Sequence, residues 1–250
     1  MEVVGDLLAR SRRSRDVALV TTAGSERTYH DLITNAYKAA NVLRYLGARE
    51  GSTIAIDSKP GVHTTLAFLG AARLGAAVRF DTTAGIDAGD RVVVAPLDDE
   101  SALDPDPGTN LVVFDGPPDR PETTHWEAEL WSENPGTPPS DVGPDDPVIR
   151  TSSPDAVDIV THRSLLETAG EVAAAHGIDA DSRVVLRTSL ADPKAVAAGI
   201  VAPLSRGGTI VLADRTASDG TPRGDVAVVA DADGGVPEPR RVAVSTVDRF

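Results

Sequence analysis

The sequence contains no cysteine. This absence excludes disulfide bonds, thiolate ligands for a metal and a cysteine nucleophile. No segment approaches the roughly 18–20 consecutive apolar residues of a membrane-spanning helix. The first residues, Met1 to Val4, lack the basic start and the apolar stretch of a secretion signal. The sequence therefore predicts a cytoplasmic protein that does not interact with the membrane.

Lysine and aromatic residues are scarce. The chain has three lysines, Lys38, Lys59 and Lys194, and its aromatic content is 4%. The core must therefore consist mainly of valine, leucine, isoleucine and alanine. The 38 acidic residues outnumber the 24 basic ones, which gives a net charge of −14. Nucleic acid is excluded as a partner, because neutralising its phosphates requires a basic surface stripe.

The charge balance also bears on the origin of the protein. An acidic, lysine-poor surface is typical of cytosolic proteins of halophiles, which stay hydrated in molar salt, where the Debye length is about 3 Å. A GC-rich genome also favours arginine over lysine. Both interpretations of the composition remain open.

Short apolar runs alternate with segments of helical periodicity along most of the chain. Repeated strand–helix–strand order predicts an α/β fold, with parallel sheets flanked by helices and right-handed crossovers. The predicted strands are 17–20, 27–28, 53–56, 77–80, 91–95, 111–114, 148–149, 184–186, 209–212, 226–229 and 242–244, and the predicted helices are 4–13, 29–46, 62–74, 163–176 and 193–204.

Prolines and acidic residues concentrate in residues 116–147. This composition predicts an ordered surface loop or a linker, in which Trp126, Leu130 and Trp131 could form a short helix. The predicted organisation is a first α/β subdomain over residues 1–115, this loop or linker, and a second α/β subdomain over residues 148–250.

Three segments of the first half carry motifs in a characteristic order. Residues 28–32 (Thr-Tyr-His-Asp-Leu) resemble the Thr-Tyr-x-Glu-Leu motif of the AMP-forming acyl-CoA synthetases, the adenylate-forming ligase superfamily. Residues 46–56 and 67–76 are similar to two further motifs of that superfamily. Each motif mainly encodes helix caps and close packing, but their order and spacing are more specific. The resemblance covers about residues 17–80 and 148–213, and it implies the fold of the N-terminal part of the large domain of these synthetases.

Residues 148–165 resemble the phosphate-loop region of the same superfamily. There a strand leads into a Thr/Ser/Gly-rich loop ending in Pro-Lys-Gly, followed by a short strand and Thr-His. In this sequence no glycine or lysine lies between Thr151 and Thr161, and Asp155 and Asp158 occupy the segment instead. Like charges repel, so two aspartates in this place oppose the binding of a triphosphate. The pattern indicates that the scaffold was kept while the chemistry was lost.

The resemblance implies ATP or AMP as the ligand, and it implies nucleotide-binding roles for Thr151, Ser152, Ser153, Thr161 and His162. For most of these residues a structural role is the alternative. The hydroxyl residues before Pro154 are typical of a turn, and Thr161 is typical of a helix cap with the His162 side chain half-buried beside it. A sharper interpretation makes His162 an electrophile or base near an acyl group.

No catalytic residue and no metal site is predicted. The other histidines, His30, His63, His125 and His176, show no metal-ligand spacing among themselves and are expected to be surface or packing residues.

Two functions remain open on the sequence. The first is an acyl-CoA synthetase-like protein that is not catalytically competent alone, because its phosphate loop is degenerate and the later motifs and C-terminal domain of the family are not found before Phe250. Such a protein would act as a ligand-binding or partner module, with another protein or a second copy of itself as partner. The alternative is an AMP-forming acyl-CoA ligase, acetyl-CoA synthetase-like, that is completed by a separate chain. A fold alone cannot decide between them.

Overall fold

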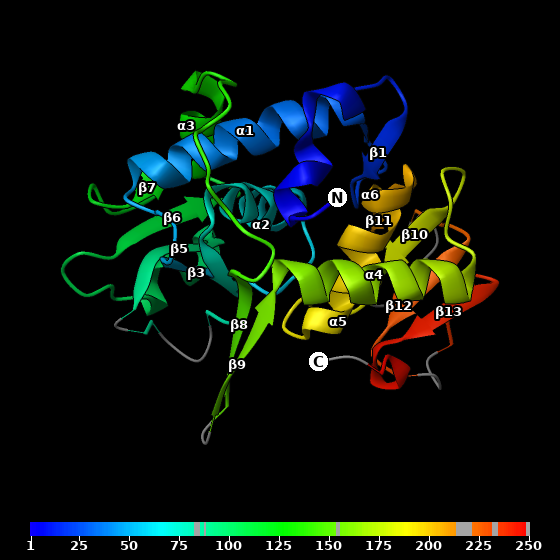
Figure 1. The fold of residues 1–250 in the computed structure, drawn as a ribbon. Coiled ribbons are helices and arrows are strands. Elements are labelled where there is room, and N and C mark those ends of the chain that lie inside the picture. Colours follow the sequence, from blue (N-terminus) through cyan, green and yellow to red (C-terminus); the bar gives the residue numbers. More distant parts are fainter. Residues whose placement is uncertain (83–85, 88, 154–155, 214–221, 232–234, 249–250) are drawn as a thin grey trace.

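The computed structural model describes residues 1–82, 86–87, 89–153, 156–213, 222–231 and 235–248, with the backbone alone at residues 152, 153, 156 and 157. Two largely parallel sheets enclose a layer of helices (Figure 1). The predicted α/β fold with parallel sheets flanked by helices is confirmed.

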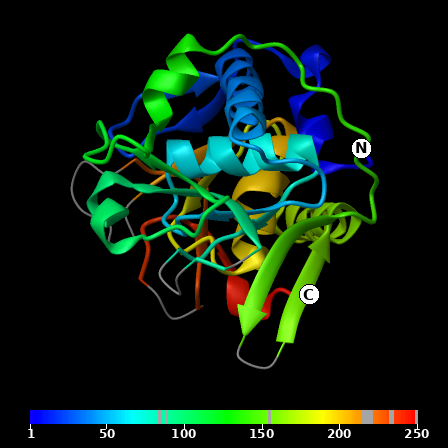
Figure 2. The same ribbon diagram turned by 90° about the vertical axis from the view of Figure 1, so that its left-hand side faces the viewer.

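The larger sheet has seven strands, in the spatial order β7-β6-β5-β3-β4-β8-β9. Neighbouring strands are parallel except for β8 and β9, which form an antiparallel hairpin at one edge. Figure 2 shows this hairpin extending away from the body of the protein. The strands are β3 (Thr53–Ile56), β4 (Ala77–Arg79), β5 (Asp90–Pro96), β6 (Asn110–Phe114), β7 (Thr124–His125), β8 (Pro147–Ser153) and β9 (Ala156–Thr161).

The smaller sheet has six strands, in the order β13-β12-β10-β11-β1-β2. It is parallel except for the pair β1 and β2 at its edge. Its strands are β1 (Val17–Val20), β2 (Glu26–Thr28), β10 (Arg183–Leu186), β11 (Thr209–Leu212), β12 (Val226–Val229) and β13 (Arg240–Ala243).

The main hydrophobic core lies between the two sheets. Successive residues of a strand point to opposite faces, so Ile54 and Ile56 of β3 join this core while Ala55 joins a smaller cluster on the outer face. The helices of the described chain are the 3-10 helices η1 (Val4–Leu8), η2 (Arg10–Arg12), η3 (Leu97–Ala102) and η5 (Val244–Thr246), the α-helices α1 (Tyr29–Tyr45), α2 (Val62–Leu74), α3 (Trp126–Ser132), α4 (His162–His176), α5 (Pro193–Val196) and α6 (Ala202–Arg206), and the π-helix η4 (Ala197–Val201).

The start of α1 follows the predicted capping pattern. The Thr28 hydroxyl accepts the backbone N–H of Asp31, and the Asp31 carboxylate accepts the N–H of Thr28 in return, which satisfies two otherwise unpaired donors. Helices α1 and α2 then cross closely at Gly70, where an added Cβ would lie 2.8 Å from the backbone nitrogen of Ala40. A glycine at this position allows the close crossing that buries both helices between the sheets.

Two predicted helices differ from the observed elements. Residues 4–13 form η1 and η2 rather than one helix, because Ala9 between them adopts an extended conformation. The predicted helix 193–204 is one helical run from α5 through η4 to α6, with a π-turn in its middle. Pro203 lies just after that turn, where the missing proline N–H cannot support regular α-helical hydrogen bonding.

The residues that form each sheet do not coincide with the predicted subdomains. Strands β1 and β2 come from the first 28 residues yet join the sheet built from residues 183–243, and β8 and β9 join the sheet that begins at residue 53. Each sheet thus takes strands from both sides of residues 116–147. That segment contains α3, the short helix that its tryptophans indicate, and also the strand β7, which was not predicted. The division into α/β subdomains at residues 1–115 and 148–250 stays a prediction.

In the part of the chain that the structure describes, no helix has the length and apolar composition needed to span a membrane.

Candidate functional site

The residues predicted from the phosphate-loop resemblance lie along the hairpin of β8 and β9. Thr151 lies in β8 opposite Asp158 of β9, and its side chain is half-buried. Ser152 and Ser153 continue β8, but the description there is limited to their backbone. Asp155 lies outside the described residues. The backbone of this segment is therefore an antiparallel β-ladder, in which pairs of residues that exchange backbone hydrogen bonds alternate with pairs that do not.

Thr161 and His162 lie at the other end of this hairpin. The Thr161 hydroxyl accepts the N–H of Ser164 and caps α4, which agrees with the structural alternative for this residue. Thr161 lies opposite Pro147, four residues before Thr151 in β8. At about 3.3 Å of strand per residue, Thr151 lies about 13 Å along β8 from the position opposite Thr161. The structure therefore does not bring the five predicted residues together around one point.

His162 is fully buried, not half-buried as the sequence suggested. Its side chain has no exposed surface, and its Nδ1 accepts the backbone N–H of Val4 at 3.1 Å. Burial lowers the pKa of His162 to about 4, although the carboxylates of Asp146 and Asp6 act in the opposite direction. The imidazole is therefore neutral at neutral pH and fixes the N-terminal 3-10 helix against α4.

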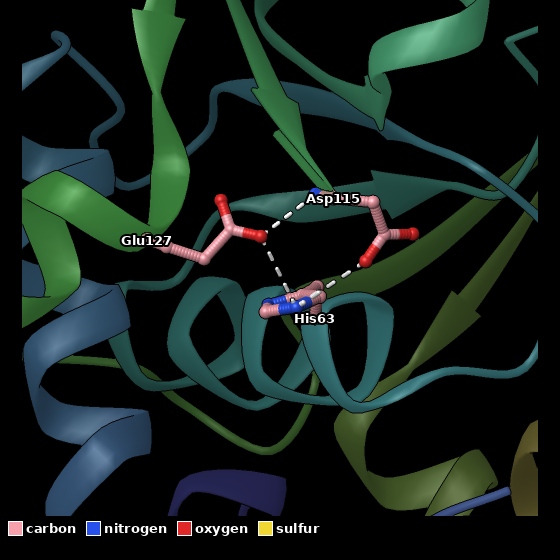
Figure 3. Close-up of side chains that lie close together, drawn as sticks. All are labelled: His63, Asp115 and Glu127. Atoms are coloured by element: carbon pink, nitrogen blue, oxygen red, sulfur yellow. Dashed lines mark hydrogen bonds and ion pairs between the residues drawn. The ribbon is translucent and has the colours of Figure 1, made fainter. Parts of the chain in front are cut away.

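A second group of polar side chains converges at the carboxyl edge of the larger sheet. His63 is the second residue of α2, Asp115 directly follows β6, and Glu127 is the second residue of α3. Figure 3 shows the three side chains pointing toward one another. We call these residues the His63 cluster. Carboxyl ends of parallel strands are where α/β proteins commonly bind ligands.

The distances within the His63 cluster are short. His63 Nε2 lies 3.5 Å from Glu127 Oε1 and 3.8 Å from Asp115 Oδ1, and the three ligand atoms all lie within 4.8 Å of one another. The backbone N–H of Asp115 donates to Glu127 Oε1 at 2.7 Å. The other Glu127 oxygen, Oε2, lies 3.3 Å from His125 Nε2. Glu127 therefore connects β6, β7 and α2.

Two features fix the orientation of His63 and Asp115. The His63 ring stacks on Phe114 with a centroid distance of 5.2 Å. Asp115 has a φ of +68°, and it is the one non-glycine residue with positive φ among the described residues. This left-handed conformation costs a side chain about 1–2 kcal/mol, and aspartate tolerates it better than most. It bends the chain sharply after β6 and turns the carboxylate back toward α2.

Burial lowers the pKa of His63, although the carboxylates of Glu127 and Asp115 oppose that shift. The ring is therefore neutral at neutral pH, and its Nδ1 has no hydrogen-bond partner among the described residues. A neutral imidazole does not compensate two carboxylates. The positive end of α2 contributes only about half an elementary charge, so the cluster keeps a net negative field.

The cluster borders a small cavity between the two sheets. His63 and Asp115 line it from one side, with Asp57 and Lys59 beyond β3, and Thr22 and Leu212 approach from the smaller sheet. Its volume is about 220 Å³, below the roughly 300–1,000 Å³ of pockets for drug-sized ligands. The cavity has room for water or a small ion beside the cluster. One imidazole nitrogen and two carboxylate oxygens could hold a metal ion there.

The sequence predicts His63 as a surface or packing residue, and it does not predict this cluster. Its members lie 52 and 12 residues apart in the sequence, with no motif around them. The one available signal is the position of Asp115 directly after a predicted strand, at an edge shared with the end of β3.

The chain is similar in sequence to one protein family and in fold to several solved structures. Residues 8–80 match the family model of the AMP-binding enzymes. The anthranilate CoA ligase AuaEII, solved with anthranoyl-AMP, superimposes with a TM-score of 0.77 at 18% identity, covering 91% of this chain and 49% of that chain. A benzoate CoA ligase from Burkholderia xenovorans LB400 gives 0.75 at 21% identity, covering 91% and 50%. MatB from Rhodopseudomonas palustris gives 0.71 at 16% identity, covering 91% and 49%. No curated protein sequence matches the chain.

The chain spans about half the length of these three proteins. Its fold is that of the N-terminal part of the adenylate-forming enzymes, as the motifs in residues 28–76 implied. The predicted resemblance to the adenylate-forming ligase superfamily is confirmed.

Proposed function

We propose that this protein is an acyl-CoA synthetase-like binding or partner module that does not catalyse adenylate formation by itself. The observation that carries the proposal is the composition of the segment of β8 and β9 that resembles the phosphate-loop region of the superfamily. Between Thr151 and Thr161 there is no glycine to let the backbone approach a phosphate and no lysine to neutralise it. Asp158, exposed on β9 opposite Thr151, adds a negative charge.

Adenylate formation requires donors that cradle the triphosphate and cations that neutralise the charge passing to pyrophosphate. In the hairpin, the Thr151 hydroxyl could still donate a hydrogen bond to a phosphate. The residue opposite it, Asp158, is negatively charged and would repel a phosphate. AMP, adenine or an acyl group without a polyphosphate would meet less repulsion. We therefore expect weak binding of AMP or an acyl ligand, and no productive binding of ATP with Mg²⁺.

The test is ATP–pyrophosphate exchange by the purified chain with a panel of carboxylic acids. It is run in molar KCl as well as at low salt, because the composition is typical of a halophile's cytoplasmic protein. We expect no exchange above the protein-free background with any acid. Robust exchange by the chain alone would overturn the proposal.

Two matched variants test whether the charge of Asp158 opposes ATP binding. Asp158→Asn removes the exposed charge opposite Thr151, whereas Asp181→Asn makes the same change in the exposed loop before β10. In calorimetric titrations with AMP and ATP at low salt, we expect the Asp158 variant to bind ATP a few-fold better and the Asp181 variant to behave like the wild type. Equal binding by all three proteins would remove Asp158 from the argument.

A second candidate function is favoured by the likeness of 91% of this chain to CoA ligases about twice its length. In this candidate the chain is one part of an AMP-forming acyl-CoA ligase and a separate chain supplies the rest. Exchange activity that appears only when such a chain is added would favour it. The molar mass in solution also bears on partnership, since the chain alone has a mass of 26.0 kDa and a homo-oligomer would give a multiple of that value.

A further inference from the structure

We propose that His63, Asp115 and Glu127 form a binding site for a divalent transition-metal ion of the Zn²⁺ type. The site is distinct from the phosphate-loop hairpin and does not depend on the function proposed above. His63 Nε2 faces both carboxylates, at 3.5 Å from Glu127 Oε1 and 3.8 Å from Asp115 Oδ1 (Figure 3).

The distances suit an ion of this size. Bonds from Zn²⁺ to histidine nitrogen and carboxylate oxygen are about 2.0–2.2 Å, so neighbouring ligand atoms of a tetrahedral site lie roughly 3.3–3.6 Å apart. The His63–Glu127 distance already falls in that range, and the His63–Asp115 distance exceeds it by a few tenths of an ångström. The ligand atoms of the third pair, Asp115 and Glu127, lie within 4.8 Å of each other. A small rotation of the exposed Asp115 side chain would shorten this distance.

The donor set selects the class of metal. Ca²⁺ and Mg²⁺ prefer shells made entirely of oxygen, with six or more ligands, whereas imidazole favours Zn²⁺ and neighbouring transition metals. The Nε2 atom of His63 faces both carboxylates and would supply the nitrogen ligand. Two carboxylates then balance the double charge of the ion.

The surroundings hold the ligands in place. Glu127 Oε1 accepts the Asp115 N–H at 2.7 Å, and His125 Nε2 lies 3.3 Å from Glu127 Oε2. Interactions of this kind around a ligating carboxylate orient it for the metal. His63 is held by its stacking on Phe114. Three protein ligands would leave a coordination position for water, for which the adjoining cavity lined by His63 and Asp115 has room.

The experiment titrates Zn²⁺ into the chelator-treated full chain by calorimetry, with Co²⁺ absorbance as a spectroscopic signature of a nitrogen–oxygen site. His63→Phe removes the nitrogen ligand while keeping a ring to stack on Phe114. Asp115→Asn keeps a residue that tolerates positive φ, and Glu127→Gln keeps an oxygen that can accept the Asp115 N–H. His30→Phe is the matched control, because His30 also lies beside a carboxylate, 3.8 Å from Asp31, but belongs to no group of three possible ligands among the described residues.

We expect one Zn²⁺ per chain, no competition from Mg²⁺ or Ca²⁺ at equal concentration, and at least about a 10-fold loss of affinity in each cluster variant. The His30 variant should bind like the wild type. Circular dichroism of the metal-free variants checks that each is folded, and three separate substitutions keep the test decisive if one is not. Absence of Zn²⁺ binding, equal binding by wild type and cluster variants, or equal binding of Ca²⁺ would each overturn the proposal.

Discussion

Helices α2 and α4 each have a histidine in their first turn, but the two side chains contact different groups. His63 is the second residue of α2 and His162 the first residue of α4, and burial lowers the pKa of both. The His162 ring is enclosed and accepts a backbone N–H from Val4, 158 residues away. The His63 side chain is 25% exposed and faces two carboxylates and a cavity.

The difference shows what a helix start does and does not determine. The local sequence sets the position of each ring at a helix terminus, but the packed neighbour sets its chemistry. Where η1 packs against α4, the neighbour supplies an N–H donor and the histidine becomes part of the core. Where β6 and α3 meet α2, the neighbours supply carboxylates, and the histidine becomes a potential ligand.

The largest expected effect is on stability, and it differs between the two histidines. His162→Ala should lower the free energy of unfolding by about 3 kcal/mol, because it creates a buried cavity and leaves the Val4 N–H without its acceptor. His63→Ala in metal-free buffer should cost about 1 kcal/mol, mainly from lost stacking on Phe114. Urea unfolding of both variants measures the difference. Equal losses would show that the two sites are not structurally distinct.

The next effect is a pH dependence of stability caused by His162. The pKa of His162 is about 4 in the folded protein and about 6.5 in an unfolded chain. Between these values the unfolded chain binds the proton first, so stability is complete above about pH 7 and falls as the pH decreases. From pH 7 to pH 5 the loss from His162 is about 2 kcal/mol.

His63 shifts in the same direction, so a variant is needed to assign the pH effect. Urea unfolding of His162→Gln between pH 7 and pH 5 should show most of that slope removed, whereas His63→Gln should remove less. The interpretation of His162 as a neutral buried histidine would be wrong if the two variants retained the wild-type slope.

Much of the fold was predictable because its signals are local. The strand–helix–strand alternation, the Thr28–Asp31 cap and the ranges of α2 and α4 follow from residues within one or two helical turns of each other. The sharing of strands between sheets was not predictable in this way. The pairing of β1 with β11 joins residues 19 and 210, and no local pattern records which sheet an apolar run will join.

The candidate site was even less predictable from local sequence patterns than the sheets. Thr161 and His162 drew attention because they are adjacent and resemble a motif, and Thr161 does cap α4. The cluster of His63, Asp115 and Glu127 depends on three elements meeting at one sheet edge and on a positive φ at Asp115. Neither fact can be recognised from the spacing of the histidines, the pattern on which the sequence prediction of a metal site depends.

The smallest predicted effect tests whether the backbone at Asp115 is held in its unusual conformation. Asp115→Ala and Asp115→Asn both remove the charge, but asparagine tolerates the left-handed region and alanine does not. We expect the alanine variant to be less stable than the asparagine variant by about 1 kcal/mol. The same pair of substitutions at Asp158, in the extended strand β9, should differ by only a few tenths of a kcal/mol. Urea unfolding in metal-free buffer compares the four proteins. If the two positions gave the same difference, the bend after β6 would not be a constraint on the sequence, and the carboxylate of Asp115 would be free to leave the cluster.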